Sequence, residues 1–478
     1  MAASIIRPSA SASSGASPTL RFLGAARTVT GSRFLLETSR ARVLFDCGLF
    51  QGLKELRLRN WDPFPIPPEQ LDAVVLTHAH LDHSGYLPAL VRGGFRGPVY
   101  CTPNTAALAA IVLPDSGRLQ EEDAAYANRK GFSKHTPALP LYSEADAQAA
   151  LRRLRPVAFG APIEIAPGVR ATLRRAGHIL GAAWVRVDVE GHAEDALLFS
   201  GDLGRPQHEI LLPPEPPDAV ATCVIESTYG DRRHDDAVAL ERFADAIVRT
   251  AERRGAIVIP AFAVDRTEVM LLTLRRLVQA GRIPDLPVYV DSPMALAALA
   301  VYERAAKDGD PEIRPEFRGD PAPFDPGRLI EAHSADASKA IHDAALPAII
   351  ISASGMATGG RVLHHLARRL PEARNSLVLV GYQAEGTRGR ALLRGATTLK
   401  MHGRYVPVRA EIVDASGFSV HADGGELVAW LASAPAAPRT VFVVHGEAEA
   451  AFALQRAIGE RVGCLAVVPQ HGERVRLD

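Results

Sequence analysis

The feature that most constrains this fold is a run of closely spaced metal-ligand side chains, THAHLDH, at residues 77–83. The run directly follows residues 73–76 (AVVL), an apolar, β-branched stretch that is typical of a buried strand. Turns that leave rigid strands often carry binding residues, because the strand aims them. Imidazole and carboxylate together suit zinc or a similar divalent ion. So many ligands in so short a run predict two adjacent metal ions, with candidates His78, His80, Asp82 and His83.

Further ligand candidates stand at the ends of other strand-like stretches. His178 lies in a glycine-flanked segment, Asp202 follows the apolar run 196–199, and His445 follows the run 440–444. Each of these residues, taken alone, is equally consistent with a polar side chain that only caps a loop. A carboxylate can bridge two cations and an imidazole cannot, so Asp202 is the expected bridging ligand.

The chain changes its pattern twice, and this predicts an inserted domain. Short strand-like runs with glycine-rich turns occupy the first part, and a helix is expected over 118–130. From about residue 231, helical stretches alternate with buried-strand patterns, which indicates a parallel α/β sheet. Strands and loops return from about residue 416. We therefore expect a tail at 1–18, one discontinuous domain at 19–228 and 413–478, and an insertion at 229–412.

Composition limits the functions that the chain can serve. With 478 residues and 47% apolar content, two ordered domains are expected. The formal net charge is zero, so any surface for a polyanion must be local. Four scattered cysteines predict no disulfide framework and fit the reducing cytoplasm. No apolar run reaches membrane-spanning length, and the Ser/Ala-rich start is a poor secretory signal, with a transit peptide left as an alternative to a tail.

Taken in order, these residues resemble the motifs of the metallo-β-lactamase superfamily. The pattern is His78-X-His80-X-Asp82-His83, then the distant His178 and Asp202. Asp46, in the sequence FDCG, resembles the first motif of that superfamily, an outer aspartate that orients the ligand loop.

Three more residues resemble motifs A, B and C of the β-CASP branch of RNA-processing nucleases. They are Glu226 in IESTYG, His421 in GFSVHAD and His445 in VHGE. That branch includes bacterial and archaeal relatives of the endonuclease subunit of the cleavage and polyadenylation specificity factor. The resemblance implies an αβ/βα metallo-β-lactamase sandwich with an inserted β-CASP domain and an active site between them. No motif residue is missing, which argues against a degenerate scaffold subunit.

The resemblance also implies a ligand set and a mechanism. His78, His80 and His178 would hold one zinc ion, Asp82, His83 and His445 the other, and Asp202 would bridge them. A hydroxide activated by the two zinc ions, with Asp82 as a catalytic ligand, would attack a phosphodiester of single-stranded RNA. His421 would serve as general acid and Glu226 would orient it. The expected activity is that of an endoribonuclease, with 5′→3′ exonuclease activity left open.

Two loops of the inserted region are candidates for gripping the RNA backbone. The first, at 352–361, follows a buried strand, and its backbone N–H groups and hydroxyls could cradle a phosphate. The second, at 381–390, offers an aromatic ring and arginines. The alternatives are a simple strand–helix turn and a solvated loop. The candidates are Ser352, Ser354, Gly355, Thr358, Arg361, Tyr382, Arg388 and Arg390, with Ser292 and Arg266 weaker ones.

Two competing functions remain open at the level of sequence. A thioesterase or lactonase of the same superfamily would explain the metal ligands but not the insertion, Glu226 or His421. A non-catalytic RNA-binding subunit would explain the insertion but not the complete ligand set. The residues do not distinguish RNA from DNA, and a homodimer is expected by analogy alone.

Overall fold

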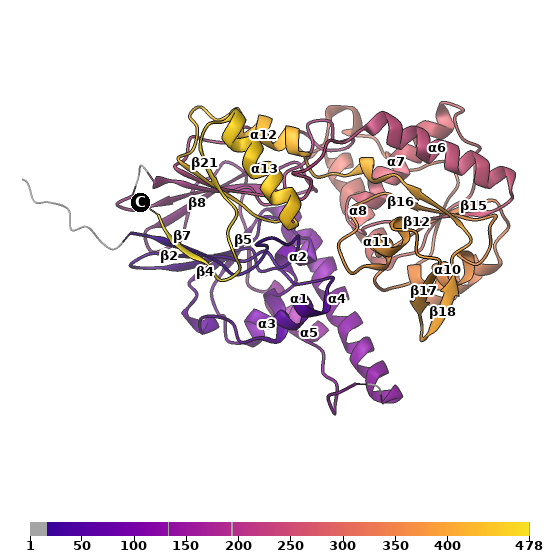
Figure 1. Ribbon diagram of the computed structural model, residues 1–478, viewed down its shortest axis with the longest axis horizontal. Coiled ribbons are helices and arrows are strands. Elements are labelled where there is room, and N and C mark those ends of the chain that lie inside the picture. The colour runs from indigo at the N-terminus through magenta and orange to yellow at the C-terminus, as the bar shows by residue number, and fades with distance from the viewer. Residues whose placement is uncertain (1–16, 132, 193–194, 478) are drawn as a thin grey trace, which may run out of the picture.

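The computed structural model describes residues 17–131, 133–192 and 195–477. Within these ranges the chain forms two lobes that lie side by side (Figure 1). One lobe contains the beginning and the end of the described chain, and the middle of the chain builds the other. The expected N-terminal tail lies outside the described residues except for Ser17 and Pro18. No described helix combines the length and the apolarity that crossing a bilayer requires.

The first lobe is a sandwich of two sheets. In one sheet the strand order is β22-β1-β2-β3-β4-β5-β6, antiparallel from β22 to β3 and parallel from β3 to β6. Its strands are β1 (Thr19–Phe22), β2 (Phe34–Glu37), β3 (Arg42–Phe45), β4 (Ala73–Val75), β5 (Val99–Cys101), β6 (Leu154–Pro156) and β22 (Arg474–Arg476).

The opposing sheet has the order β21-β20-β11-β10-β9-β8-β7, with a parallel half from β21 to β10 and an antiparallel half from β10 to β7. Its strands are β7 (Ile163–Ala166), β8 (Val169–Arg175), β9 (Ala183–Val189), β10 (Leu197–Phe199), β11 (Thr222–Ile225), β20 (Thr440–Val443) and β21 (Leu465–Val467). Apolar side chains of both sheets share one core, in which the Phe45 and Phe199 rings stack 4.1 Å apart.

Helices cover the outer faces of the sandwich. They are α1 (Lys54–Leu58), α2 (Leu81–Ser84), α3 (Leu87–Arg92), α4 (Pro103–Lys130), α5 (Glu144–Leu151), α12 (Gly424–Ala432) and α13 (Ala448–Arg461), with 3-10 turns η1 (Arg59–Trp61), η2 (Pro68–Gln70) and η6 (Ser416–Phe418). The helix expected over 118–130 is only the second half of α4. The helix begins earlier because the Thr102 side chain accepts a hydrogen bond from the backbone N–H of Thr105, and Pro103 fits the first turn.

The second lobe is built around a sheet in which every strand pair is parallel, in the order β14-β13-β15-β12-β16-β19. The strands are β12 (Ala256–Pro260), β13 (Val288–Val290), β14 (Leu329–Glu331), β15 (Ala348–Ser352), β16 (Ser376–Leu379) and β19 (Glu411–Asp414), and a separate hairpin joins β17 (Thr398–Met401) to β18 (Arg404–Pro407). Its helices are α6 (Asp236–Glu252), α7 (Arg266–Gln279), α8 (Pro293–Asp308), η4 (Pro315–Phe317), α9 (Ala335–Ala340), η5 (Ile341–Asp343), α10 (Val362–Arg369) and α11 (Arg388–Leu393).

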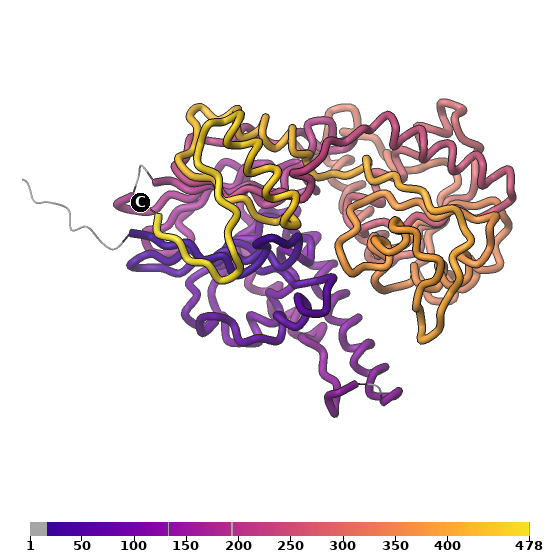
Figure 2. The backbone as a smooth tube through the Cα atoms, viewed as in Figure 1, coloured from indigo at the N-terminus to yellow at the C-terminus, as the bar shows by residue number. Residues whose placement is uncertain are grey.

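The parallel sheet is an insertion into the sandwich. The chain leaves the sandwich after β11 and returns in β20, and these two strands pair in parallel. The tube in Figure 2 accordingly places the last residues beside the first ones, where β22 pairs with β1. The sandwich with an inserted parallel sheet agrees with the fold expected from the sequence. The last inserted strand, β19, extends to Asp414, so the expected boundary at residue 412 falls inside it.

Candidate metal centre and active site

The ligand candidates converge because the strands that carry them end at one edge of the sandwich. The segment after β4 carries His78, His80, Asp82 and His83, and the loop between β8 and β9 carries His178. Asp202 follows β10 and His445 follows β20. Gly177 adopts a φ of +65°, and a Cβ there would lie 2.6 Å from the Leu212 carbonyl oxygen. Only glycine therefore fits beside His178.

The first cluster consists of three imidazoles. The Nδ1 atom of His80 lies 3.2 Å from the Nε2 atom of His78 and 3.2 Å from the Nε2 atom of His178. Burial holds the pKa values of His78 and His178 well below the ordinary histidine value. Neutral rings keep the lone pairs that metal coordination requires.

The second cluster lies beside the first and combines two imidazoles with a carboxylate. The Nε2 atoms of His83 and His445 are 3.1 Å apart, and His445 Nε2 lies 3.5 Å from the Asp82 carboxylate. His445 has a φ of +48°, a strained value for a residue with a side chain. Such strain is concentrated at functional sites, because surrounding structure must hold it in place.

Asp202 lies between the two clusters, and each of its oxygens faces a different one. Oδ1 lies 3.2 Å from His83 Nε2 and 3.4 Å from His445 Nδ1, whereas Oδ2 lies 3.5 Å from His78 Nε2. Burial alone would raise the Asp202 pKa, but the surrounding imidazoles, led by His445, more than offset it and hold the pKa well below its usual value.

The donor set fits metal ions. The ligand atoms of His78, His80, His178 and Asp202 lie within 4.8 Å of one another, and so do those of Asp82, His83 and His445. The buried Oδ1 atom of Asp202 accepts no hydrogen bond among the described residues. A buried, ionised carboxylate surrounded by neutral imidazoles is costly unless a cation neutralises it. Nitrogen and oxygen ligands in this ratio match zinc.

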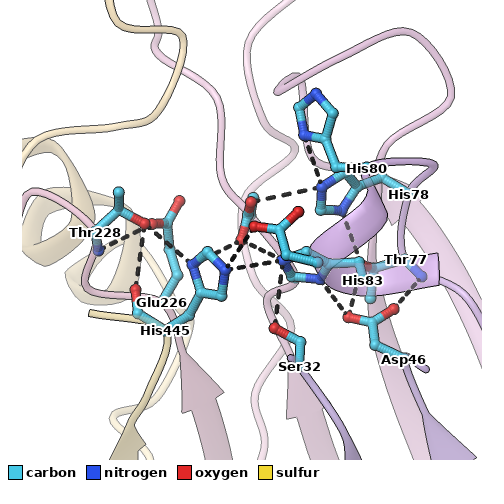
Figure 3. A network of polar contacts seen from close by, with 12 residues as sticks. Ser32, Asp46, Thr77, His78, His80, His83, Glu226, Thr228 and His445 are labelled. Carbon is cyan, nitrogen blue, oxygen red and sulfur yellow. Dashed lines mark hydrogen bonds and ion pairs between the residues drawn. The ribbon is translucent and has the colours of Figure 1, made fainter. Parts of the chain in front are cut away.

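Buried polar groups orient the second cluster (Figure 3). Asp46 lies 2.7 Å from Nδ1 of His83 and accepts hydrogen bonds from the Thr77 backbone N–H at 2.8 Å and the Thr77 hydroxyl at 3.0 Å. The Thr228 hydroxyl lies 3.1 Å from Nδ1 of His445, and the Ser32 hydroxyl lies 3.4 Å from Nε2 of His83. Such partners fix the rotation of metal-binding rings.

Sequence reasoning singled out Asp46 but not Thr77, Thr228 or Ser32. The available signal for the two threonines was their position shortly after a strand-like run, directly after it for Thr77 and three residues on for Thr228. Thr228 is 217 residues from the ring that it contacts, so its partner follows only from the pairing of β11 with β20.

His421 and Glu226 form a third group at the edge of the first cluster. His421 Nδ1 lies 3.3 Å from Glu226 and 3.9 Å from Asp202, and the His421 ring centroid is 4.3 Å from that of His178. Glu226 is held in place by the backbone N–H of Leu203, at 2.8 Å. Burial disfavours the charged form of His421, but the Glu226 carboxylate more than offsets it, so the His421 pKa is raised. The pair is therefore suited to hold and release a proton.

In the first predicted RNA loop, at 352–361, several polar side chains form hydrogen bonds within the protein. The Ser354 hydroxyl accepts a hydrogen bond from the Thr358 backbone N–H at 3.0 Å and lies 3.0 Å from the Thr358 hydroxyl. Ser352 is buried and donates to the Asp291 carbonyl oxygen. Arg361, a candidate phosphate contact, donates from Nη1 to the buried Asp291 carboxylate at 2.8 Å. A Cβ at Gly355 would lie 2.7 Å from the Phe262 ring, so this glycine allows close packing.

The second predicted RNA loop, at 381–390, lies nearer to the pair formed by His421 and Glu226. The Tyr382 ring packs edge-on against Tyr229 at 5.5 Å, and the Tyr229 ring lies 6.1 Å from His421. Arg388 donates to the carbonyl oxygens of Ala357, Thr358 and Lys400, so it braces the two loops. Arg390 faces Glu385 at 3.6 Å.

Arg266, the first residue of α7, is a buried cation without a matching partner. Its Nε and Nη1 atoms have no hydrogen-bond acceptor among the described residues. Its Nε atom would lie 3.8 Å from a Cβ on Gly381, next to Tyr382. Burial lowers the Arg266 pKa. Two buried guanidinium N–H groups beside the loop at 381–390 are thus left without an acceptor among the described residues.

Three domain families match the chain in succession. Residues 41–258 match the Beta-lactamase superfamily domain, residues 267–392 match the Beta-Casp domain, and residues 405–469 match the Zn-dependent metallo-hydrolase RNA specificity domain.

Several characterised proteins are similar over most of this chain. Ribonuclease TTHA0252 of Thermus thermophilus is 38% identical over 92% of this chain and 95% of its own length. Transcription termination factor FttA of Methanocaldococcus jannaschii is 31% identical over 89% of this chain and 66% of its own length. FttA of Pyrococcus abyssi is 32% identical over 95% of this chain and 70% of its own length. The crystal structure of a protein of unknown function from Enterococcus faecalis V583 shares the fold, with a TM-score of 0.51 at 14% identity over 97% of this chain and 100% of that one.

Proposed function

The chain belongs to the β-CASP branch of the metallo-β-lactamase superfamily, and we propose that it is a zinc-dependent ribonuclease that cleaves single-stranded RNA. Its hydrolase chemistry follows from the family and from the similarity to a ribonuclease over nearly the whole chain. The RNA specificity domain at 405–469 supports RNA as the substrate. We propose two zinc ions per chain, held by the two clusters that share Asp202.

The observation that carries this proposal is the position of His421 and Glu226 beside the metal clusters. A thioesterase needs no such acid, because the thiolate that a thioester expels is a weak base. Phosphodiester cleavage expels an alkoxide, which must receive a proton, and His421 is the protonatable group 3.9 Å from Asp202. The pair comes from two distant parts of the chain, since Glu226 follows β11 and His421 precedes α12.

The residues divide the reaction between them. When bound, zinc supplies Lewis acidity and lowers the pKa of water. Asp82 and Asp202 provide negative charge at the second cluster and between the clusters. His421 donates its proton to the departing sugar oxygen as the P–O bond breaks, while Glu226 stabilises the imidazolium before transfer. Arg266 binds a non-bridging phosphate oxygen, and Tyr382 stacks on a base of a single strand.

Endonuclease activity with an additional 5′→3′ exonuclease mode remains part of the proposal, as does a homodimer. The test is cleavage of a 5′-end-labelled, 5′-blocked single-stranded RNA by the purified protein. Internal fragments would demonstrate endonuclease activity. Loss of cleavage on chelation, and recovery with zinc, would support the metal assignment. Hydrolysis of thioester or lactone panels without any RNA cleavage would overturn the proposal.

The first prediction concerns His421. We expect His421→Ala to lower kcat for RNA cleavage by about 10²- to 10⁴-fold, because the leaving alkoxide loses its proton donor. RNA affinity and zinc content should remain near those of the parent protein. His402→Ala, on the hairpin turn between β17 and β18, is a matched control and should keep full activity. An active His421→Ala variant would favour a non-catalytic, RNA-binding role for the pair.

A further inference from the structure

A concavity of about 450 Å³ lies between α3 and α5, on the sandwich lobe. We call it the arginine pocket, because its lining consists of Val91, Arg92, Arg96, Asp146, Ala149, Arg152 and Arg153. None of these residues belongs to the metal clusters or to the loops at 352–361 and 381–390. In Figure 1, α3 and α5 lie at the lower edge of the sandwich lobe.

The charge of the arginine pocket is strongly positive. Four guanidinium groups face a single carboxylate, that of Asp146. Asp146 Oδ2 already accepts hydrogen bonds from the backbone N–H and the hydroxyl of Ser143, both at 2.9 Å, and lies 3.9 Å from Arg92. The carboxylate caps α5, and its single charge offsets only one of the four guanidinium charges. Because the whole chain has a formal net charge of zero, this excess is local.

Backbone carbonyls fix two of the arginines in place. Arg96 Nη1 donates to the carbonyl oxygens of Val91 and Phe95, each at 3.0 Å, and Arg153 Nη1 donates to the Arg96 carbonyl oxygen at 2.6 Å. No other side-chain hydrogen bond of Arg96 or Arg153 occurs among the described residues. The remaining N–H groups of both guanidinium forks are thus held in position without an acceptor.

We propose that the arginine pocket binds phosphate groups of RNA away from the metal clusters, an inference that rests on the proposed ribonuclease function. Planar guanidinium forks match phosphate geometry in a bidentate manner, which ammonium groups cannot do. The two apolar lining residues, Val91 and Ala149, offer too little surface for an apolar ligand. Only an RNA that extends beyond the metal clusters would reach the pocket as well, so the site would favour long substrates.

The test is RNA binding by the double variant Arg92→Gln/Arg152→Gln in the full chain. Both side chains are exposed, so the fold should tolerate the change. We expect affinity for a long unstructured RNA to fall about tenfold, and the slope of log K against log salt to fall by about 0.7 for each lost phosphate contact. A short RNA that reaches only the metal clusters serves as the comparison. Its affinity and the kcat for its cleavage should not change.

The matched control is Arg242→Gln/Arg304→Gln, which removes the same charge from exposed positions on α6 and α8. Equal salt slopes for the two double variants would overturn the inference. Titration with inorganic phosphate and with poly-glutamate separates the other occupants of the site. Binding of either one with no effect on long RNA would also overturn it. If the parent protein neither binds nor cleaves RNA, the proposed ribonuclease function is overturned, and the inference about the arginine pocket with it.

Discussion

At the scale of single residues, the Asp46 carboxylate is the clearest example of a side chain that acts through another. It lies 2.7 Å from His83 Nδ1 and holds the Thr77 backbone, so it fixes both the ring and the start of the ligand segment. We expect Asp46→Asn to weaken zinc retention by about 10- to 100-fold, the usual effect of losing such a partner. Competition with a chromophoric chelator measures this directly and needs no RNA.

The control for this prediction is Asp72→Asn, since Asp72 accepts a hydrogen bond from the Arg42 backbone at a distance from the clusters. Unchanged zinc retention in Asp46→Asn would show that His83 is oriented by the backbone alone. If Asp46→Asn binds its full amount of zinc when the zinc concentration is high, the result would support a positioning role for Asp46.

The role of a residue could be predicted from the sequence where its interaction partners are close to it along the chain. The cluster at 77–83 is dense enough to identify metal chemistry from spacing alone. The contact of Arg361 with Asp291 could not be predicted, because Asp291 lies 70 positions away and follows β13, the strand that pairs with β15. An arginine beside a glycine-rich loop has the same sequence signature whether it faces phosphate or a carboxylate.

At the scale of elements, the loop at 177–181 that carries His178 is held by side chains of the inserted lobe. The Tyr302 hydroxyl, on α8, accepts a hydrogen bond from the Leu180 backbone N–H at 2.9 Å. The Glu312 carboxylate accepts from the Gly181 backbone N–H at 2.9 Å and from the Asn104 amide at 2.8 Å. The inserted lobe therefore helps to position His178, a proposed metal ligand, in the sandwich.

The burial of the Glu312 carboxyl group makes the free energy of unfolding depend on pH. Burial raises the Glu312 pKa from 4.5 to about 7, so the folded state binds a proton that the unfolded chain releases. The stabilising contribution is fully present below pH 4.5 and is lost as the pH rises through about 7. The loss corresponds to about 3 kcal/mol. We expect Glu312→Gln to be less sensitive to pH than the parent across this window.

The measurement is denaturant unfolding of both proteins at several pH values, compared as a difference curve. Glu316→Gln, in the exposed turn that follows, is the matched control and should leave the pH dependence unchanged. If the free energy of unfolding depends on pH in the same way for Glu312→Gln and the parent, the raised pKa of Glu312 would be contradicted.

Elements were predictable where burial makes their pattern uniform. The four inserted strands β12, β13, β15 and β16 are buried parallel strands, and their apolar runs stood out in the sequence. The beginning of α4 was missed, because its N-terminal residues are small and mixed with apolar ones and give no clear helical face. The hairpin β17–β18 and the short edge strand β14 were missed as well, since edge strands are half-exposed and lack a continuous apolar run.

At the scale of the whole molecule, the metal clusters connect parts of the chain that are far apart in sequence. Their ligands come from both sheets of the sandwich and from both sides of the insertion, since His445 follows β20 and His78 to His83 follow β4. No ligand comes from the parallel sheet. Ion binding should therefore stabilise the sandwich, by about 4 kcal/mol when free zinc exceeds its Kd a thousandfold.

Zinc removal should consequently affect the two lobes differently. We expect chelation to speed amide hydrogen exchange in β20 (Thr440–Val443) and in the loop at 177–181, because the ligands at their ends lose the ions that neutralise Asp202. Exchange in β15 (Ala348–Ser352), at the centre of the inserted sheet, should remain slow. Hydrogen exchange followed by mass spectrometry resolves these segments, and His445→Ala should reproduce the effect at β20 even in excess zinc. An equal increase in both lobes would mean that the sandwich and the insertion unfold as a single unit, and that the ions stabilise that unit rather than one lobe.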